Sequence, residues 1–233
     1  IKRRFKEDPR ERVFSDAEVL AFWRGIDHCP ASEQSKIAMR LCFVLGQRPK
    51  EIAHLRKSRL SLDVAEPTAT VDKVTSKNRT EHVIPLPRLA VQLLKQACAM
   101  SPSADWVFPS PKGDGPIDPH TFAKIVDRER RRSGDGKLFG IPDAQLYDSK
   151  KTVATFLGNA GYPDQFIGLL FNHLTAKGGS VTGKHYNHAR YMQQKREMVE
   201  LWGRHLEIIL GVDREANKSN VVHIKLAPQG RHG

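Results

Sequence analysis

Arg48 is the first residue of this chain whose type and position suggest chemistry on a phosphodiester. Cleavage of a phosphodiester needs a nucleophile, cations that neutralise charge on the non-bridging oxygens, and an acid that protonates the leaving hydroxyl. In the segment GQRPKEIAHL, Arg48 follows an apolar helical run, and Glu51 comes one turn later, where its carboxylate can orient the guanidinium. An ordinary surface arginine with an i,i+3 ion pair has the same spacing. Arg48 is therefore a candidate phosphate ligand that needs further support.

The charge of the chain favours nucleic acid as a partner. The 38 Lys and Arg residues exceed the 26 Asp and Glu residues by 12, and the pI is near 9.8. Some basic proteins, however, bind no polyanion. Neither paired carboxylates nor a His-rich pattern predicts a two-metal site, and the three cysteines lack metal-ligand spacing. We therefore expect side-chain cations to neutralise the phosphate, with no metal and no cofactor.

The elements that must position such residues are mainly helical. Ser15 and Glu18 have the spacing of a capping box, which predicts a helix ending near Gly25, and Gly46 can end a second helix that starts near Ser32. The segments TATVDKV and TEHVIPL flank SKNR and predict a small antiparallel hairpin. Further helices are predicted at about 47–55, 87–100, 120–132, 145–160, 163–173 and 188–210. The apolar face of the last one comprises Tyr191, Met198, Leu201, Trp202, His205, Leu206 and Ile209.

Gly46, Arg48 and Glu51 form a Gly-x-Arg-x-x-Glu pattern that resembles the first arginine box of the tyrosine recombinases, the phage-integrase family. The segment TSKNRTEHVIPL is similar to the β-hairpin of that family, in which a lysine serves as general acid. Lys77 is the residue that this resemblance implies. A lysine near a hairpin turn is more often only solvated. The hairpin follows the arginine box in the sequence, as it does in the family, and this order supports the match.

One box departs from the family pattern. Where the family has His-x-x-Arg at the head of a helix, residues 147–150 read YDSK, so that Tyr147 replaces the histidine and Lys150 the arginine. A phenol still donates a hydrogen bond to a phosphate oxygen. A lysine offers a point charge in place of the bidentate fork of arginine. The resemblance therefore implies a variant site of reduced activity, in which Lys150 or its neighbour Lys151 faces the phosphate.

Two further boxes complete the resemblance. LLFNH is similar to the Leu-Leu-x-His box, which makes His173 the matching phosphate contact, and GGSVTGKHYNHARY places Tyr186 where the family places its nucleophile. A phenol there would attack phosphorus and form a covalent phosphotyrosyl bond that conserves bond energy for rejoining. Tyr191 is the rival, but its place on the apolar stripe favours a core role. The expected DNA contacts are Arg79, Lys151, Lys184 and His185.

These boxes occur in family order and imply a mainly α fold with a small antiparallel sheet (α+β), forming a catalytic domain over residues 14–211. This domain would bind double-stranded DNA and recombine it at specific sites through Tyr186. Residues 1–13 would be a linker or arm from an N-terminal DNA-binding domain, and residues 212–233 a tail that docks in trans in a tetramer on DNA. Without a leader or a membrane-spanning run in the sequence, we expect a cytoplasmic protein.

Two other interpretations stay open. A DNA-binding protein that keeps the recombinase fold without catalysis would explain Tyr147 and Lys150. A type IB topoisomerase-like enzyme would use similar chemistry without site preference. The final helix and the segment before it favour the integrase interpretation.

Overall fold

The computed structural model describes residues 11–76, 78–172 and 191–212, which form a mainly helical fold with one small sheet, as the sequence predicts. The helices are α1 (Asp16–Gly25), η1 (Ile26–His28), α2 (Glu33–Leu45), α3 (Pro49–Ala53), η2 (Lys57–Arg59), α4 (Arg88–Met100), α5 (His120–Ser133), α6 (Asp148–Asn159), α7 (Asp164–Leu170) and α9 (Met192–Leu210). The strands are β1 (Leu60–Ser61), β2 (Thr68–Val71) and β3 (His82–Pro85). None of these described helices is both long and apolar enough to cross a bilayer.

Local capping residues set the first helix boundaries. The amide of Glu18 donates to Ser15 Oγ at 3.3 Å, and the Glu18 carboxylate accepts from the Ser15 amide at 2.9 Å, which is the predicted capping box. Helix α2 ends at Gly46, whose φ of +62° suits glycine. A Cβ on Gly46 would also lie 2.8 Å from Cε1 of Phe171 and 3.0 Å from Cβ of Val153. Glycine therefore both stops α2 and lets it approach α6 and the end of α7.

The sheet has strand order β1-β2-β3, and both pairs are antiparallel. The predicted hairpin of β2 and β3 is confirmed, with Val71 opposite His82 as the last pair. Residues 72–81 therefore connect the two strands as a loop longer than a tight turn. Strand β1 was not predicted, because a two-residue strand shows no alternation and is defined only by its pairing with Thr68 and Ala69.

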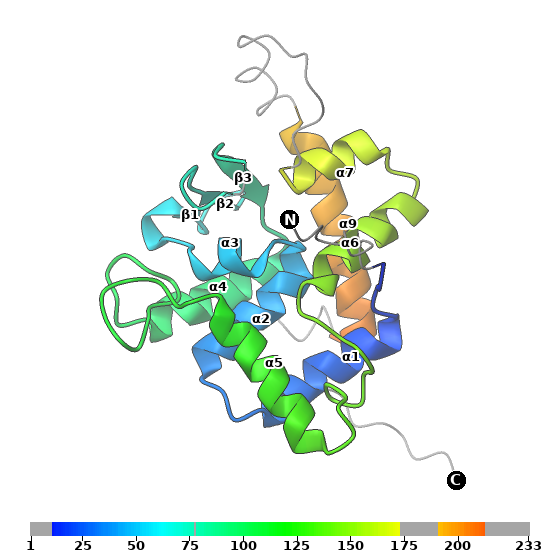
Figure 1. Ribbon diagram of the computed structural model, residues 1–233. Coiled ribbons are helices and arrows are strands. Elements are labelled where there is room, and N and C mark those ends of the chain that lie inside the picture. The colour runs from blue at the N-terminus through cyan, green and yellow to red at the C-terminus, as the bar shows by residue number, and fades with distance from the viewer. Residues whose placement is uncertain (1–10, 77, 173–190, 213–233) are drawn as a thin grey trace, which may run out of the picture.

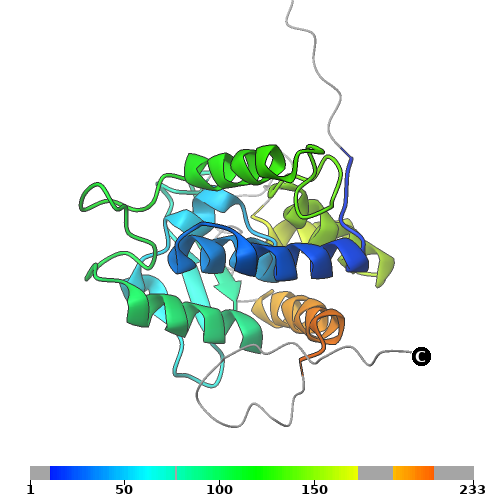
Figure 2. The same cartoon turned by 90° about the horizontal axis from the view of Figure 1, so that it is seen from below.

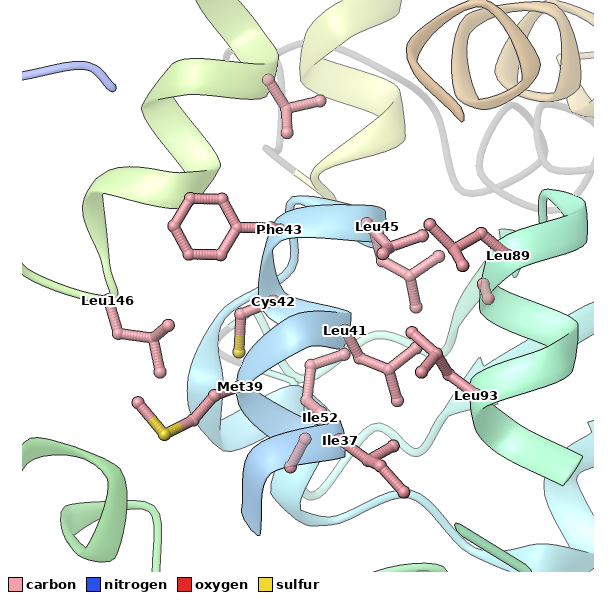
Figure 3. Packing of buried hydrophobic residues seen from close by; sticks show 14 of the residues in the cluster. Ile37, Met39, Leu41, Cys42, Phe43, Leu45, Ile52, Leu89, Leu93 and Leu146 are labelled. Carbon is pink, nitrogen blue, oxygen red and sulfur yellow. The ribbon is translucent and has the colours of Figure 1, made fainter. Parts of the chain in front are cut away.

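The apolar core surrounds α2, which is buried on both sides. Leu41 points toward Leu93 of α4, and Phe43 points toward α6 (Figure 3). The ring of Phe43 also packs against Phe14 and Phe22, with centroid distances of 4.9 and 4.4 Å. Each fully buried side chain of this size stabilises the fold by about 1.5–3 kcal/mol. Helix α2 is therefore the rigid centre from which Gly46 and the segment after it project.

The sheet and α7 lie at one end of the molecule, and α1 lies at the other (Figure 1). Helix α9 joins the two ends, because it packs against α7 and β3 as well as against α1. Viewed from below, α5 lies on one side of α1 and the pair α4 and α9 on the other (Figure 2).

The predicted apolar face of α9 was wrong in part. Leu201, His205 and Ile209 are only half-buried. The buried residues of α9 are Lys195, Met198, Val199, Trp202, Gly203, Leu206, Glu207 and Leu210. The helix contacts β3, α1, α2, α4, α6 and α7, so it buries a broader and partly polar surface that a single apolar stripe does not describe.

Candidate active site

Arg48 lies between α2 and α3, where a buried carboxylate fixes it. Arg48 Nη1 donates to Glu51 Oε1 at 2.9 Å, and the Arg48 amide donates to Glu51 Oε2 at 3.1 Å. The side chain of Glu51 is 2% exposed and that of Arg48 is 13% exposed, so this is not a surface ion pair. Within the described residues, Arg48 Nε is buried without a hydrogen-bond partner. The guanidinium is thus oriented by Glu51 and retains a donor for a further acceptor.

Lys150 lies in the first turn of α6, where it is 6% exposed. Its Nζ is 5.0 Å from the centroid of the Phe171 ring, a cation–π distance. Lys151 is half-buried, and Tyr147, just before the helix, is 47% exposed. Of the two lysines, Lys150 is therefore the one that packs against Phe171.

The segment that leads to Arg48 meets the residues around Lys150 at Phe171. Gly46 approaches the Phe171 ring, as described above, and the buried Gln47 Nε2 donates to the carbonyl of Leu170 at 3.2 Å. Lys150 packs on the same Phe171 ring. The first arginine box, the YDSK box and the end of α7 therefore converge, although 102 positions separate residues 48 and 150 in the sequence.

Asn172 bonds the loop between β2 and β3 (residues 72–81) to the end of α7. Its Nδ2 donates to Ser76 Oγ at 2.7 Å, its Oδ1 accepts from Thr80 Oγ1 at 3.2 Å, and its carbonyl accepts from Asn78 Nδ2. We call these bonds the loop junction. Asn172 has a φ of +50°, a conformation that Asn tolerates better than most residues. The loop junction therefore ties the residues on both sides of position 77 to the residue before position 173.

Five predicted site residues lie outside the described residues: Lys77, His173, Lys184, His185 and Tyr186. Two of them have described neighbours in the chain, since Ser76 and Asn78 flank Lys77, and Asn172 precedes His173. Their roles stay predictions.

The remaining predicted contacts lie on the described part of the chain. Arg79 is exposed and has a φ of +54°. Tyr191, the rival nucleophile, is half-buried at the start of α9, and its ring centroid lies 5.7 Å from that of Phe166. This packing agrees with the structural role expected for Tyr191.

The described part of this site is cationic and rich in hydrogen-bond donors. Arg48 and Lys150 supply two fixed positive charges, which is what a phosphate requires of a site that neutralises its non-bridging oxygens. Among the described residues, no group of three or more His, Cys, Asp or Glu side chains could hold a metal ion. The arrangement therefore suits the binding of a phosphate by side-chain cations.

A sequence profile described as the phage integrase family matches residues 12–193. The chain belongs to the phage integrase family. The prophage integrase IntZ of Escherichia coli (strain K12) is 28% identical over 83% of this chain and 44% of its own length. The integrase of Shigella phage Sf6 is 25% identical over 86% of this chain and 48% of its own length. The chain thus spans about half the length of these relatives.

Solved integrases and recombinases share the fold. The integrase of mycobacterium phage Brujita has a TM-score of 0.60 and 20% identity, over 86% of this chain and 61% of that structure. The site-specific recombinase XerH, bound to its difH substrate in a pre-cleavage complex, has a TM-score of 0.56 and 16% identity, over 70% of this chain and 47% of that structure. The mainly α fold with a small sheet is therefore that of the phage integrase family.

Several residues that connect the predicted boxes or lie near them were missed at the level of sequence. Gln47, Phe171 and Asn172 connect the boxes, and Lys195 is a buried cation near the start of α9. The sequence contains one sign of the role of Asn172, because this polar residue interrupts the apolar run LLFNH. Lys195 shows a similar sign, because this charged residue lies one helical turn from Met198 and Val199 on the buried face of α9.

Proposed function

We propose that this chain is the strand-transfer domain of a site-specific DNA recombinase and that Tyr186 is its nucleophile. The observation that carries the proposal is a convergence around the end of α7 of Lys150, the loop junction at Asn172, and Gly46 and Gln47, which lead directly to Arg48. Membership of the phage integrase family and the net charge of +12 support it.

In the proposed reaction, Arg48 and Lys150 neutralise the non-bridging oxygens of the phosphate, helped by His173 and Tyr147. The phenol of Tyr186 loses its proton to solvent as its oxygen bonds to phosphorus. The bond from phosphorus to the leaving oxygen breaks, and Lys77 protonates that oxygen, which departs as a hydroxyl. Glu51 holds the Arg48 guanidinium in its orientation. Reversal of the same step with another hydroxyl rejoins the strand.

We further propose that double-stranded DNA is the partner, that Arg79, Lys151, Lys184 and His185 contact it, and that a tetramer assembles on two duplexes. In that assembly, residues 14–211 form the catalytic domain, residues 1–13 connect it to a DNA-gripping domain, and residues 212–233 dock on a neighbouring protomer. The family membership favours this interpretation over that of a type IB topoisomerase-like enzyme.

The proposal is tested by covalent capture on nicked oligonucleotides drawn from DNA flanking the gene, resolved on a denaturing gel. The wild-type chain should form a protein–DNA adduct, and Tyr191→Phe should form it as well. Tyr186→Phe should form none, and Lys150→Met should form it about 100-fold more slowly, because one preorganised donor is lost. An adduct that persists in Tyr186→Phe would contradict the proposal.

A second candidate is a DNA-binding protein with the recombinase fold and an impaired site. The observation that favours it is the YDSK box, in which Lys150 packs on Phe171 and Tyr147 is 47% exposed. Lysine cannot make the bidentate contact that arginine makes with a phosphate. Tight DNA binding without an adduct, in both the wild type and Lys150→Arg, would establish this second function instead.

A further inference from the structure

Lys195 is a buried lysine at the end of the first turn of α9. The residue is 2% exposed, and its Nζ donates to the carbonyl of Val83 in β3 at 3.2 Å. Burial lowers the pKa of Lys195 to about 8, so the ammonium form dominates at neutral pH. Within the described residues it forms no ion pair. In this part of the chain, the Val83 carbonyl is the one hydrogen-bond acceptor of the Lys195 ammonium, and burial of a charge with so few partners costs stability.

Arg196 adds a second attachment of α9 to the sheet. Its Nη2 lies 3.4 Å from the carbonyl of Pro67, the residue before β2, and its Nε lies 3.9 Å from Glu66 Oε1. The Pro67 carbonyl also accepts from the Leu86 amide, just beyond β3. We call Lys195 and Arg196 the sheet clamp. Through it, the start of α9 is bonded to the backbone at both strands of the hairpin.

The sheet clamp and the loop junction hold two points of the chain to the same hairpin. Asn172, at the end of α7, is bonded to Ser76 and Thr80 in the loop between β2 and β3. Lys195, near the start of α9, is bonded to β3 itself. Residues 173–190 connect these two points in the sequence, and Tyr186 stands nine positions before Lys195.

We propose that Lys195 is a positioning residue for strand cleavage, which fixes the base of the segment bearing Tyr186 on the hairpin whose loop bears Lys77. This inference rests on the proposed function, in which Tyr186 attacks and Lys77 protonates the leaving group. A common base for both residues raises the fraction of time in which they are aligned on one phosphate, and small misplacements of reacting groups slow reactions by large factors.

The test compares two variants, each of which removes one bond from an α9 side chain to a backbone carbonyl. Lys195→Met removes the bond to Val83 and keeps an apolar stem of similar length. Trp202→Phe removes the bond from Trp202 Nε1 to the Phe43 carbonyl, 2.8 Å long, and leaves the sheet clamp intact. Adduct formation on a nicked duplex, DNA affinity and the thermal midpoint are measured for the full chain of each variant.

Lys195→Met should form the adduct at least about tenfold more slowly than the wild type, with unchanged DNA affinity and an equal or higher thermal midpoint, because a buried charge has been removed. Trp202→Phe should have a lower midpoint and a cleavage rate within about twofold of the wild type. Amide hydrogen exchange over residues 191–199 should accelerate in Lys195→Met and stay unchanged in Trp202→Phe.

Two results would overturn the inference. One is cleavage by Lys195→Met at the wild-type rate, and the other is an unchanged amide exchange rate over residues 191–199 in that variant. If the wild type itself forms no adduct, the proposed function fails and the role of Lys195 in cleavage fails with it. The exchange experiment then still decides whether the sheet clamp orders the start of α9.

Discussion

Two neighbouring regions meet near Gly46, and different interactions hold them. On one side, α2 is enclosed by apolar side chains, such as Phe43 between Phe14 and Phe22. On the other side, the loop junction fixes Asn172 through hydrogen bonds to three residues of one loop. Apolar packing stabilises without strong directionality, whereas hydrogen bonds fix directions and contribute little net stability each. We therefore expect the core to determine stability and the loop junction to determine the alignment of the site.

The largest effect on stability is expected in the core. Phe43→Ala should lower the free energy of unfolding by about 4 kcal/mol, because it removes a buried ring and leaves a cavity. Phe43→Leu should cost about 1 kcal/mol. Urea denaturation measures both changes. At a temperature where each variant is folded, the rate of adduct formation should stay within about twofold of the wild type. A large loss of cleavage rate in Phe43→Leu would contradict the expectation that the core determines stability and the loop junction determines alignment.

Arg48 belongs to both regions, because it pairs with the buried Glu51 and directly follows Gln47, which is bonded to the carbonyl of Leu170. Arg48→Met should lower the free energy of unfolding by about 3 kcal/mol, since it leaves the Glu51 carboxylate buried without its cation. The double variant Arg48→Met/Glu51→Met should recover at least half of that loss in urea denaturation. Neither variant should form the adduct at a measurable rate. Recovery of cleavage in the double variant would show that Arg48 serves only the fold.

The pH dependence of stability isolates Lys195. Its pKa is lowered from 10.5 to about 8 in the folded protein, so between these values the unfolded chain binds more protons than the folded one. Stability from this group therefore rises as the pH increases from 8 to 10.5, by about 3 kcal/mol in total. The difference in unfolding free energy between the wild type and Lys195→Met, measured by denaturation at each pH, should rise by that amount. A flat difference would contradict the burial of this ammonium.

A change in stability smaller than that of Phe43→Ala or Arg48→Met is expected at the loop junction. Asn172→Gly keeps the positive φ of +50° and removes the side-chain bonds to Ser76 and Thr80, so it should cost about 2 kcal/mol. Adduct formation should nevertheless slow by more than about tenfold, because the loop bearing Lys77 keeps only the bond from Asn78 to the backbone carbonyl of residue 172. Single-turnover cleavage and urea denaturation together measure this split. A rate loss no larger than that of Phe43→Leu would remove the distinction between the two regions.

The sequence predicted the elements whose signals are local. Ser15 and Glu18 specify the start of α1 through their own backbone bonds, and Gly46 specifies the end of α2 through its backbone conformation. The order of the family boxes likewise predicted Arg48 beside Glu51 and the fold as a whole. None of these predictions requires knowledge of a distant contact.

The features that were not predicted depend on partners far along the chain. Strand β1 exists only through its pairing with β2. The place of Asn172 is defined by Ser76, 96 positions earlier, and the burial of Lys195 by Val83, 112 positions earlier. A polar residue in an apolar run is a signal of such contacts, but it does not identify the partner.

The most direct test of the account is the identity of the residue that carries the DNA. Trypsin cleaves after Lys184, Arg190 and Lys195, so it separates HYNHAR, which contains Tyr186, from YMQQK, which contains Tyr191. The captured adduct would be digested with nuclease and trypsin, and its peptides analysed by mass spectrometry. The account predicts a nucleotide on residues 185–190. A nucleotide on residues 191–195 would contradict the assignment of Tyr186 as the nucleophile.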